Sequence, residues 1–197
     1  MIWSQIQDRP MAFAARAKYR ADSRRLFHNL EHIENLYFAA EHVYGFSYDL
    51  NLDRAILTHD VIYDERPLKE LRSGKWLLNN CEEDDGVWIA FNHVMKTAKP
   101  QVEKDNRMIL LDFARLRHEE YILEDRAKIL QEAIYLTGTS EDAFTRANMA
   151  YFESIVPNFA EEHLVDLPAW EKTAFREIRA GMLFSIEYSR HLLEKAA

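Results

Sequence analysis

The chain is poor in the two residues that most often interrupt regular structure, with five glycines and five prolines among 197 residues. A sandwich or barrel of many short strands needs frequent turns, and those turns draw on glycine and proline. The low count therefore disfavours such folds. Apolar residues also recur at helical spacing, for example at Ala174, Ile178, Met182 and Ile186, as in a helix that faces a core. We predict an all-α chain of about nine helices.

Candidate caps and breakers set the boundaries of the predicted helices. Gly45 and Gly138 stand where helices should stop, and Pro67 suits a first turn. The residues that can cap a helix start are Asn51, Thr139 and Ser140. The helices are expected over residues 4–19, 24–44, from 51, 67–80, from 84 or 85 to 99, from 102, 119–136, 140–155 and 169–193, with a short helix at 161–165. No repeat or linker divides the chain, so we predict one domain over residues 1–197.

The charge balance and the cysteine count exclude several classes of protein. The chain has 25 basic and 33 acidic residues and a net charge of −8, the opposite of the balance that holds proteins to polymeric nucleic acid. The single cysteine, Cys81, excludes an internal disulfide and a multi-cysteine metal site. No signal-peptide core is present near the N-terminus, and no apolar run approaches the roughly 20 residues that span a bilayer. We expect a cytoplasmic protein without a nucleic-acid or membrane partner.

Two apolar runs carry carboxylates where a core-facing helix should have none. His59-Asp60 interrupts the run 55–63, and Asp112 interrupts the run 109–114. An unpaired buried carboxylate costs several kcal/mol, so such groups are normally paired or bound to a metal. A hydrogen-bonded structural aspartate explains either site alone. Two such sites in a chain with eight histidines favour a metal, because histidine is the commonest metal ligand.

A third segment, His28-Asn29-Leu30-Glu31-His32, places two histidines four residues apart and so on one helix face. Two surface histidines would give the same spacing. The segment also matches H-x-x-E-H, the inverted motif of zinc peptidases, with Glu31 as the general base. That alternative leaves the aspartates at 60 and 112 without a role.

In chain order, His32, His59-Asp60 and Asp112 resemble the HD superfamily of metal-dependent phosphohydrolases. In that superfamily a His, a His-Asp pair and a distant Asp bind one divalent metal inside an all-helical domain. The flanking residues are similar to a branch of small bacterial and phage HD phosphohydrolases. The similar residues are Tyr19-Arg20, Arg24, 27–33, 59–64, 70–73, His93, Thr97 and 110–116. The resemblance covers residues 19–136, and the helices of residues 139–197 are expected to pack on that part.

The chain departs from the branch at three places. Phe27 stands where the branch usually has Tyr, and Lys69 precedes Glu70 where Asn is typical. The residues after Asp112 lack the second acidic residue and the glycine that commonly follow. None of these departures removes a proposed ligand, so they concern substrate preference more than metal binding.

The resemblance implies one divalent ion held by His32, His59, Asp60 and Asp112. Two imidazoles and two carboxylates without thiolates suit Mn, Fe, Co, Ni or Mg. Neighbouring helical residues diverge by about 100°, so His59 and Asp60 reach one ion only at an edge of their helix. The implied reaction is hydrolysis of a nucleotide or other small phosphate ester, with Asp60 and Glu70 as the catalytic residues. Glu70 would act as a general acid/base or orient the attacking water, and the candidate phosphate-binding residues are Arg20, Arg24, His28, Lys75 and His93.

Three other functions stay open besides the phosphohydrolase. An HD fold could sense a nucleotide without turning it over. An HD-type di-iron oxygenase could use His93 and His118 for a second metal. The zinc peptidase described above is the third. The aromatic C-terminal helices could support a homodimer.

Overall fold

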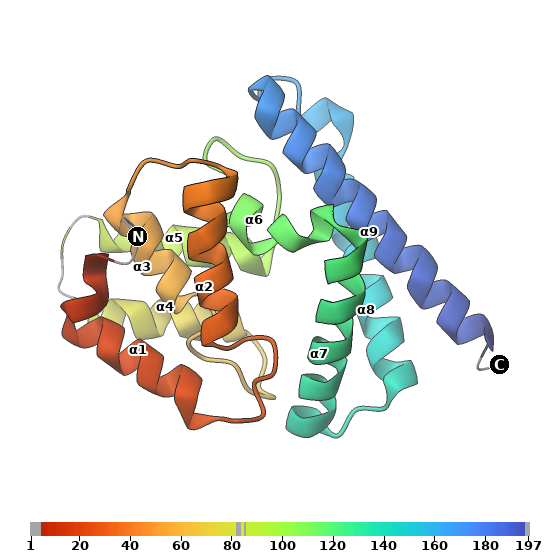
Figure 1. Ribbon diagram of the computed structural model, residues 1–197, viewed down its shortest axis with the longest axis horizontal. Coiled ribbons are helices and arrows are strands. Elements are labelled where there is room, and N and C mark those ends of the chain that lie inside the picture. Colours follow the sequence, from red (N-terminus) through yellow and green to blue (C-terminus); the bar gives the residue numbers. More distant parts are fainter. Residues whose placement is uncertain (1–4, 82–83, 85, 196–197) are drawn as a thin grey trace. The chain divides into compact units, whose positions relative to one another are not determined.

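The computed structural model describes residues 5–81, 84 and 86–195. Every regular element in these residues is helical, with nine α-helices and several short 3-10 or π turns, which confirms the predicted all-α class and helix number. The backbone forms two compact units, the first of Met1–Lys99 with Arg107–Asp112 and the second of Pro100–Asn106 with Phe113–Ala197. Figure 1 shows the first unit in red to yellow-green and most of the second in green to blue. The single domain over residues 1–197 stays a prediction.

The first unit contains six α-helices and two short turns. The helices are α1 (Pro10–Ala21), α2 (Leu30–Phe38), α3 (Leu50–Thr58), α4 (Lys69–Asn80), α5 (Val87–Ala98) and α6 (Arg107–Asp112). A 3-10 turn (Gln5–Asp8) precedes α1, and a π turn (Ala39–Val43) continues α2.

Helix α3 forms the centre of the first unit. All seven residues from Leu52 to Thr58 are buried, and the helix contacts α1, α2, α4, α5 and α6. Leu52, Ala55 and Ile56 have no exposed surface, and the charged residues Asp53 and Arg54 of the same helix are buried as well, so the helix is surrounded on all sides. The end of α3 therefore delivers the next residues of the chain into the interior of the unit.

Helix α2 begins at Leu30, later than the predicted residue 24, because Asn29 caps it. The Asn29 side chain accepts hydrogen bonds from the backbone N–H groups of Glu31 and His32, which satisfies two donors that a helix start leaves free. After the π turn the chain reaches Gly45 at φ +60°, a left-handed conformation that suits glycine and agrees with the predicted stop.

The starts of α3 and α5 depend on aspartate caps. Asp49 accepts hydrogen bonds from the N–H groups of Asn51 and Leu52, so Asp49 caps α3, and the predicted Asn51 cap is wrong. Asp84 accepts from the first backbone N–H groups of α5, as predicted, while the alternative cap, Asp85, lies outside the described residues. In both cases a carboxylate accepts from helix N–H groups at the positive end of the helix dipole.

Two other predicted starts shift by a few residues. Helix α4 begins at Lys69 rather than at Pro67, because Leu68 has φ +60° and cannot continue a right-handed helix. Helix α6 begins at Arg107 rather than near residue 102. The first predicted helix, over 4–19, is a 3-10 turn followed by α1, and its residue 4 lies outside the described part of the chain.

The second unit contains α7 (Glu119–Thr137), α8 (Glu141–Ile155) and α9 (Ala169–Lys195) with 3-10 turns at Ala114–Arg117, Val156–Phe159 and Glu161–His163. Gly138 ends α7 in the left-handed conformation, as predicted. The Ser140 hydroxyl accepts from the N–H of Ala143, so Ser140 rather than Thr139 is the cap of α8. The predicted short helix at 161–165 is the last of the 3-10 turns.

Helix α9 supplies the main core stripe of the second unit. Ala174, Ile178, Met182 and Ile186 are all buried, which confirms the stripe predicted from their spacing. Phe175 packs on Phe159 from the 3-10 turn, with ring centroids 5.5 Å apart. No helix in the described residues is long and apolar enough to cross a membrane.

Candidate metal centre

The first histidine of the site, His32, lies in the first turn of α2. The Asn29 cap fixes this turn by accepting the N–H of His32 at 3.2 Å. The imidazole is only 4 % exposed. A buried imidazole in a capped first turn has little freedom, so its Nε2 atom has a defined direction.

The His59-Asp60 pair straddles the end of α3. The helix ends at Thr58, His59 is its C-cap residue, and Asp60 lies in the following turn. Two neighbours inside a helix would diverge by about 100°, but Asp60 is no longer held to helical geometry. This helix end explains how both side chains reach the same place.

The last residue, Asp112, ends the short helix α6. The preceding residues Met108–Leu111 are buried in the core of the first unit, which anchors the helix. Asp112 itself keeps 20 % of its side-chain surface exposed. Solvent can therefore reach the site from the side of this carboxylate.

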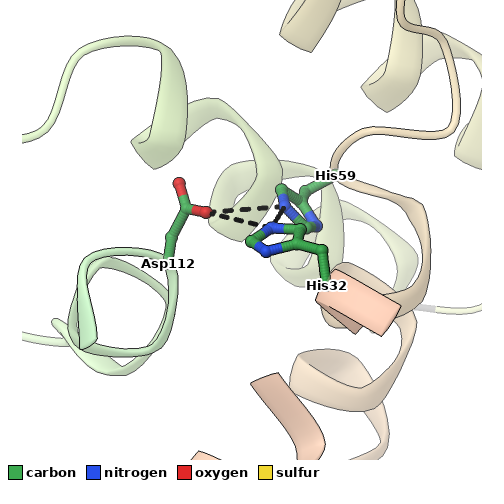
Figure 2. Close-up of side chains that lie close together, drawn as sticks. All are labelled: His32, His59 and Asp112. Atoms are coloured by element: carbon green, nitrogen blue, oxygen red, sulfur yellow. Dashed lines mark hydrogen bonds and ion pairs between the residues drawn. The ribbon is translucent and has the colours of Figure 1, made fainter. Parts of the chain in front are cut away.

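The four side chains converge on one small volume. The Nε2 atoms of His32 and His59 are 3.2 Å apart. Asp112 Oδ1 lies 3.5 Å from the Nε2 atom of His32 and 3.6 Å from that of His59. Figure 2 shows these three side chains pointing toward one another. Asp60 Oδ2 lies 3.0 Å from His59 Nε2 and 3.8 Å from His32 Nε2.

These distances fit the first coordination sphere of a metal ion. Donor atoms about 2.1 Å from one ion lie about 3.0 Å apart at neighbouring octahedral corners and about 3.4 Å apart in a tetrahedron. One ligand atom each of His32, His59 and Asp112 lies within 4.8 Å of the other two. Asp60 adds a second carboxylate oxygen beside His59.

The hydrogen bond made by Nδ1 of His59 shows that Nε2 is the nitrogen available to a metal. This Nδ1 lies 3.0 Å from the carbonyl oxygen of Ile56. A carbonyl only accepts hydrogen bonds, so Nδ1 carries the proton and donates. The lone pair of a neutral His59 is then on Nε2, the atom that faces the cluster. Metal-binding histidines are commonly oriented by this kind of backbone contact.

Burial and neighbouring charges shift the pKa values of the cluster in different directions. Burial lowers the pKa of His32. Burial also opposes the charged form of His59, but the Asp60 and Asp112 carboxylates outweigh it and raise the pKa of His59 well above its ordinary value. The two imidazoles likewise overcome burial at Asp112 and hold its pKa at about 2. The two carboxylates thus favour a positive charge between them.

An arginine that the sequence analysis did not single out supports the Asp60 turn. The Arg25 guanidinium donates to the carbonyl oxygens of Asp60, Val61 and Tyr63 at 3.1, 3.3 and 3.2 Å. Arg25 is 7 % exposed, and its guanidinium carbon lies 5.4 Å from the ring centroid of Tyr19. Arg25 therefore holds the backbone that carries Asp60.

Two of the predicted phosphate-binding residues are at least partly buried. The His28 ring stacks on Tyr63, with centroids 3.8 Å apart and an interplanar angle of 19°. Burial raises the pKa of Asp60, but the positive charges of His59 and then of His28 outweigh burial and hold this pKa well below its ordinary value. His93 is buried on α5. Tyr63 stacks on His28 and follows Asp60 closely in the chain. The sequence alone gave Tyr63 no role beyond its place in the segment 59–64.

The other predicted catalytic and phosphate-binding residues lie at the surface. Arg20 and Lys75 are exposed, and Arg24 pairs with Asp22 at 2.7 Å. Glu70 lies half-buried in the first turn of α4. No hydrogen bond or ion pair joins these four residues to the histidine–aspartate cluster within the described parts of the chain. Their roles stay predictions.

Comparison with known proteins adds no relative. No protein-family model, curated protein or solved structure matches the chain. Any function therefore has to be argued from the residues of the site.

Proposed function

We propose that the chain is a metal-dependent phosphohydrolase of the HD superfamily. One divalent ion would be held by His32, His59, Asp60 and Asp112. The substrate would be a nucleotide or another small phosphate ester. The ion would be Mn, Fe, Co, Ni or Mg, since the donors are imidazole nitrogens and carboxylate oxygens.

The observation that carries the proposal is the convergence of two imidazole nitrogens and two carboxylates at ligand distances. The closest pairs are 3.0 and 3.2 Å apart. Both histidines are buried, so their polar atoms need a partner. Two buried carboxylates need positive charge beside them, and a divalent ion would supply it.

The chemistry divides between the ion and the chain. When bound, a divalent ion lowers the pKa of a water and offsets charge on a phosphoryl oxygen. His59 contributes a lone pair on Nε2 because Ile56 fixes its tautomer. Asp112 is the ligand nearest to solvent, so the substrate would approach from its side. His28 would bind the phosphate, and Glu70 would accept or return a proton.

The geometry favours this proposal over the zinc peptidase. In a peptidase of the H-x-x-E-H type, His28 and His32 would share the metal. The His28 and His32 ring centroids are 6.1 Å apart, and His28 stacks on Tyr63 instead. The close partners of His32 are His59 and Asp112.

The oxygenase and the sensor are distinguished from the phosphohydrolase in different ways. A second iron would need His93 and His118, and His118 is an exposed residue at the start of α7. A sensor would use the same metal site, so only turnover distinguishes it from an enzyme.

The proposal is tested by elemental analysis of the purified protein together with a phosphate-release screen over nucleotides and other phosphate esters. We expect one divalent ion per chain and release of phosphate from at least one substrate. His59→Ala should lose the metal, and Asp60→Asn should lose activity by at least about 100-fold. The matched control is His191→Ala, which removes an exposed histidine of α9 and should keep both.

Two results would overturn the proposal. The first is a wild-type protein without metal after supplementation with each candidate ion, or metal content that His59→Ala does not change. The second is a metal-loaded protein that binds a nucleotide and turns over none of the esters, which would assign the chain to the sensors.

A further inference from the structure

The first unit has a second polar feature, a cavity of about 210 Å³ beside the Asp60 turn. None of the four proposed metal ligands lines it. We propose that this cavity binds the phosphate group of a small molecule independently of the metal. Its charged lining residues are Lys18, Asp22, Arg25, Asp64 and Arg66.

Arg25 gives the cavity a fixed positive charge. It is 7 % exposed, and its three hydrogen bonds to backbone carbonyls hold the guanidinium in place. These bonds use three of its five N–H groups. No carboxylate in the described part of the chain lies within ion-pair distance of Arg25, so its charge is not neutralised by a direct partner. A rigid guanidinium of this kind is a typical phosphate-binding group.

Lys18 adds a second positive charge. It is an exposed residue of α1 on the wall of the cavity. It makes no ion pair with any residue of the described ranges 5–81, 84 and 86–195. Its ammonium group can therefore turn toward an anion without breaking an existing contact.

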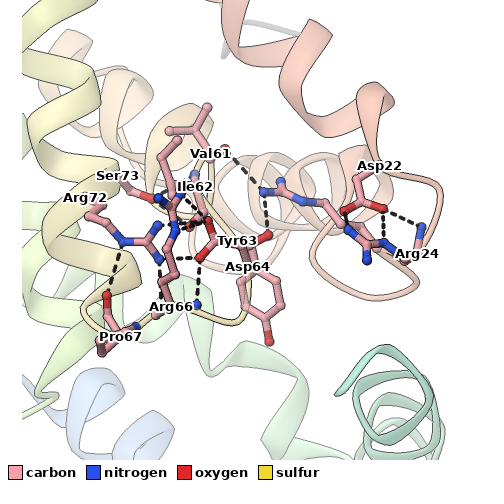
Figure 3. A network of polar contacts seen from close by, with 11 residues as sticks. Asp22, Arg24, Val61, Ile62, Tyr63, Asp64, Arg66, Pro67, Arg72 and Ser73 are labelled. Carbon is pink, nitrogen blue, oxygen red and sulfur yellow. Dashed lines mark hydrogen bonds and ion pairs between the residues drawn. The ribbon is translucent and has the colours of Figure 1, made fainter. Parts of the chain in front are cut away.

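The carboxylates on the cavity wall are already paired. Asp22 accepts two charge-assisted hydrogen bonds from the Arg24 side chain, at 2.8 and 2.7 Å. Asp64 accepts from Arg66 at 2.7 Å and from Arg72 at 2.9 Å. Figure 3 shows both groups of contacts. The hydrogen bond from Arg24 lowers the pKa of Asp22 to about 2, so this carboxylate stays ionised and bound to its arginine.

The local charge balance is therefore positive in an acidic chain. The cations that line the cavity are Lys18, Arg25 and Arg66, while the carboxylates that line it are Asp22 and Asp64. The whole chain has a net charge of −8. A local positive field in an acidic protein concentrates anions at that place.

The size of the cavity limits the ligand. Pockets that enclose drug-sized ligands are about 300–1,000 Å³, and this cavity is smaller. A phosphate group fits, whereas the remainder of a nucleotide would extend into solvent. Free phosphate and the phosphate of an ester share this chemistry, and the experiment has to distinguish them.

The test uses the full chain stripped of metal with a chelator and titrated with inorganic phosphate by calorimetry. We expect saturable binding of one phosphate per chain. Lys18→Gln should weaken it about tenfold or more, the effect of losing one charged hydrogen-bond donor. Lys99→Gln, which makes the same charge change at an exposed residue outside the cavity, should bind phosphate like the wild type.

A second titration uses a nucleoside monophosphate. Binding at least tenfold tighter than that of inorganic phosphate identifies an ester as the ligand, and equal or weaker binding identifies free phosphate. The proposal is overturned if metal-free protein shows no saturable phosphate binding up to about 10 mM. It is also overturned if binding requires a divalent ion or if Lys18→Gln and Lys99→Gln bind phosphate equally. Because the protein is metal-free, failure of the proposed phosphohydrolase leaves this result unaffected.

Discussion

The imidazole of His59 donates from Nδ1 to the carbonyl oxygen of Ile56, 3.0 Å away and one helical turn earlier. This contact joins the end of α3 to the chemistry of the cluster. The carbonyl belongs to a helix that is buried on all sides, so the imidazole is oriented by the core of the unit. The same contact directs Nε2 toward His32, at 3.2 Å.

A preorganised site predicts that metal stabilises the folded chain. A ligand that binds only the folded state adds about 2.7 kcal/mol at a concentration 100 times its Kd. We expect Mn²⁺ or Ni²⁺ to raise the midpoint of thermal unfolding of the wild type, measured by circular dichroism. In His32→Ala the midpoint should not respond to either ion. A shift of equal size in both proteins would mean that the ions bind elsewhere.

The hydrogen bonds from Arg25 to the backbone of the Asp60 turn predict that Arg25 affects metal affinity without touching the metal. Arg25→Lys keeps the charge but cannot donate to the carbonyl oxygens of Asp60, Val61 and Tyr63 at once. The turn should loosen, and metal affinity should fall about 10- to 100-fold, the usual effect of losing a group that orients a ligand. Competition with a metal-sensitive dye measures the change. Arg24→Lys, on the neighbouring exposed residue, is the matched control and should retain wild-type affinity.

The sequence indicated Asp60 and Asp112 because these carboxylates interrupt apolar runs, whereas His32 joined them only through the family resemblance. Asp60 and Asp112 are each preceded by buried residues, and burying such a group without a partner is costly. The α9 stripe was predictable for a related reason, since apolar spacing reports which face is buried. Both signals can be read from neighbouring residues in the chain, and the burial that they predict is the burial observed.

Other features depend on contacts between distant residues and have no local signal. Arg24 and Arg25 are adjacent and chemically identical, yet one is exposed and paired with Asp22, while the other is buried under the Asp60 turn. The sequence analysis selected Arg24. The sequence likewise did not predict that α3 ends at Thr58, because the run 55–63 has apolar residues on both sides of this helix end.

The ion pair between the buried Arg54 and the exposed Asp84 predicts a dependence of stability on pH. The Arg54 side chain is 1 % exposed and donates to both carboxylate oxygens of Asp84, at 2.9 and 2.7 Å. These bonds lower the pKa of Asp84 below its ordinary 3.8. The unfolded state therefore binds more protons between the two pKa values, and stability rises with pH through that window. The contribution is complete above about pH 4 and is lost as the pH falls through the folded-state pKa.

Asp84→Asn tests this directly. Removing one partner of a fully buried pair costs about 3–5 kcal/mol, but Asp84 is 45 % exposed, so we expect a loss of about 1–2 kcal/mol at pH 7. Urea unfolding at pH 7, 5 and 3 should show the difference between the wild type and the variant becoming smaller at the lowest pH. Asp166→Asn, at an exposed aspartate without an ion pair to the described residues, should match the wild type at each pH. A difference that is constant with pH would contradict the assignment.

Gly181 in the middle of α9 predicts the outcome of a simple substitution in the second unit. A Cβ atom there would collide with the backbone carbonyl oxygen of Leu116, in the 3-10 turn that packs on α9. Alanine would gain about 1 kcal/mol in helix propensity, whereas overpacking against a backbone atom costs about 1–3 kcal/mol. We expect Gly181→Ala to lower the free energy of unfolding by about 1 kcal/mol in urea titrations. The control is Glu187→Ala, on an exposed face of the same helix, which should stay within about 0.5 kcal/mol of the wild type. An alanine variant that is more stable than the wild type would show that α9 does not approach the turn this closely.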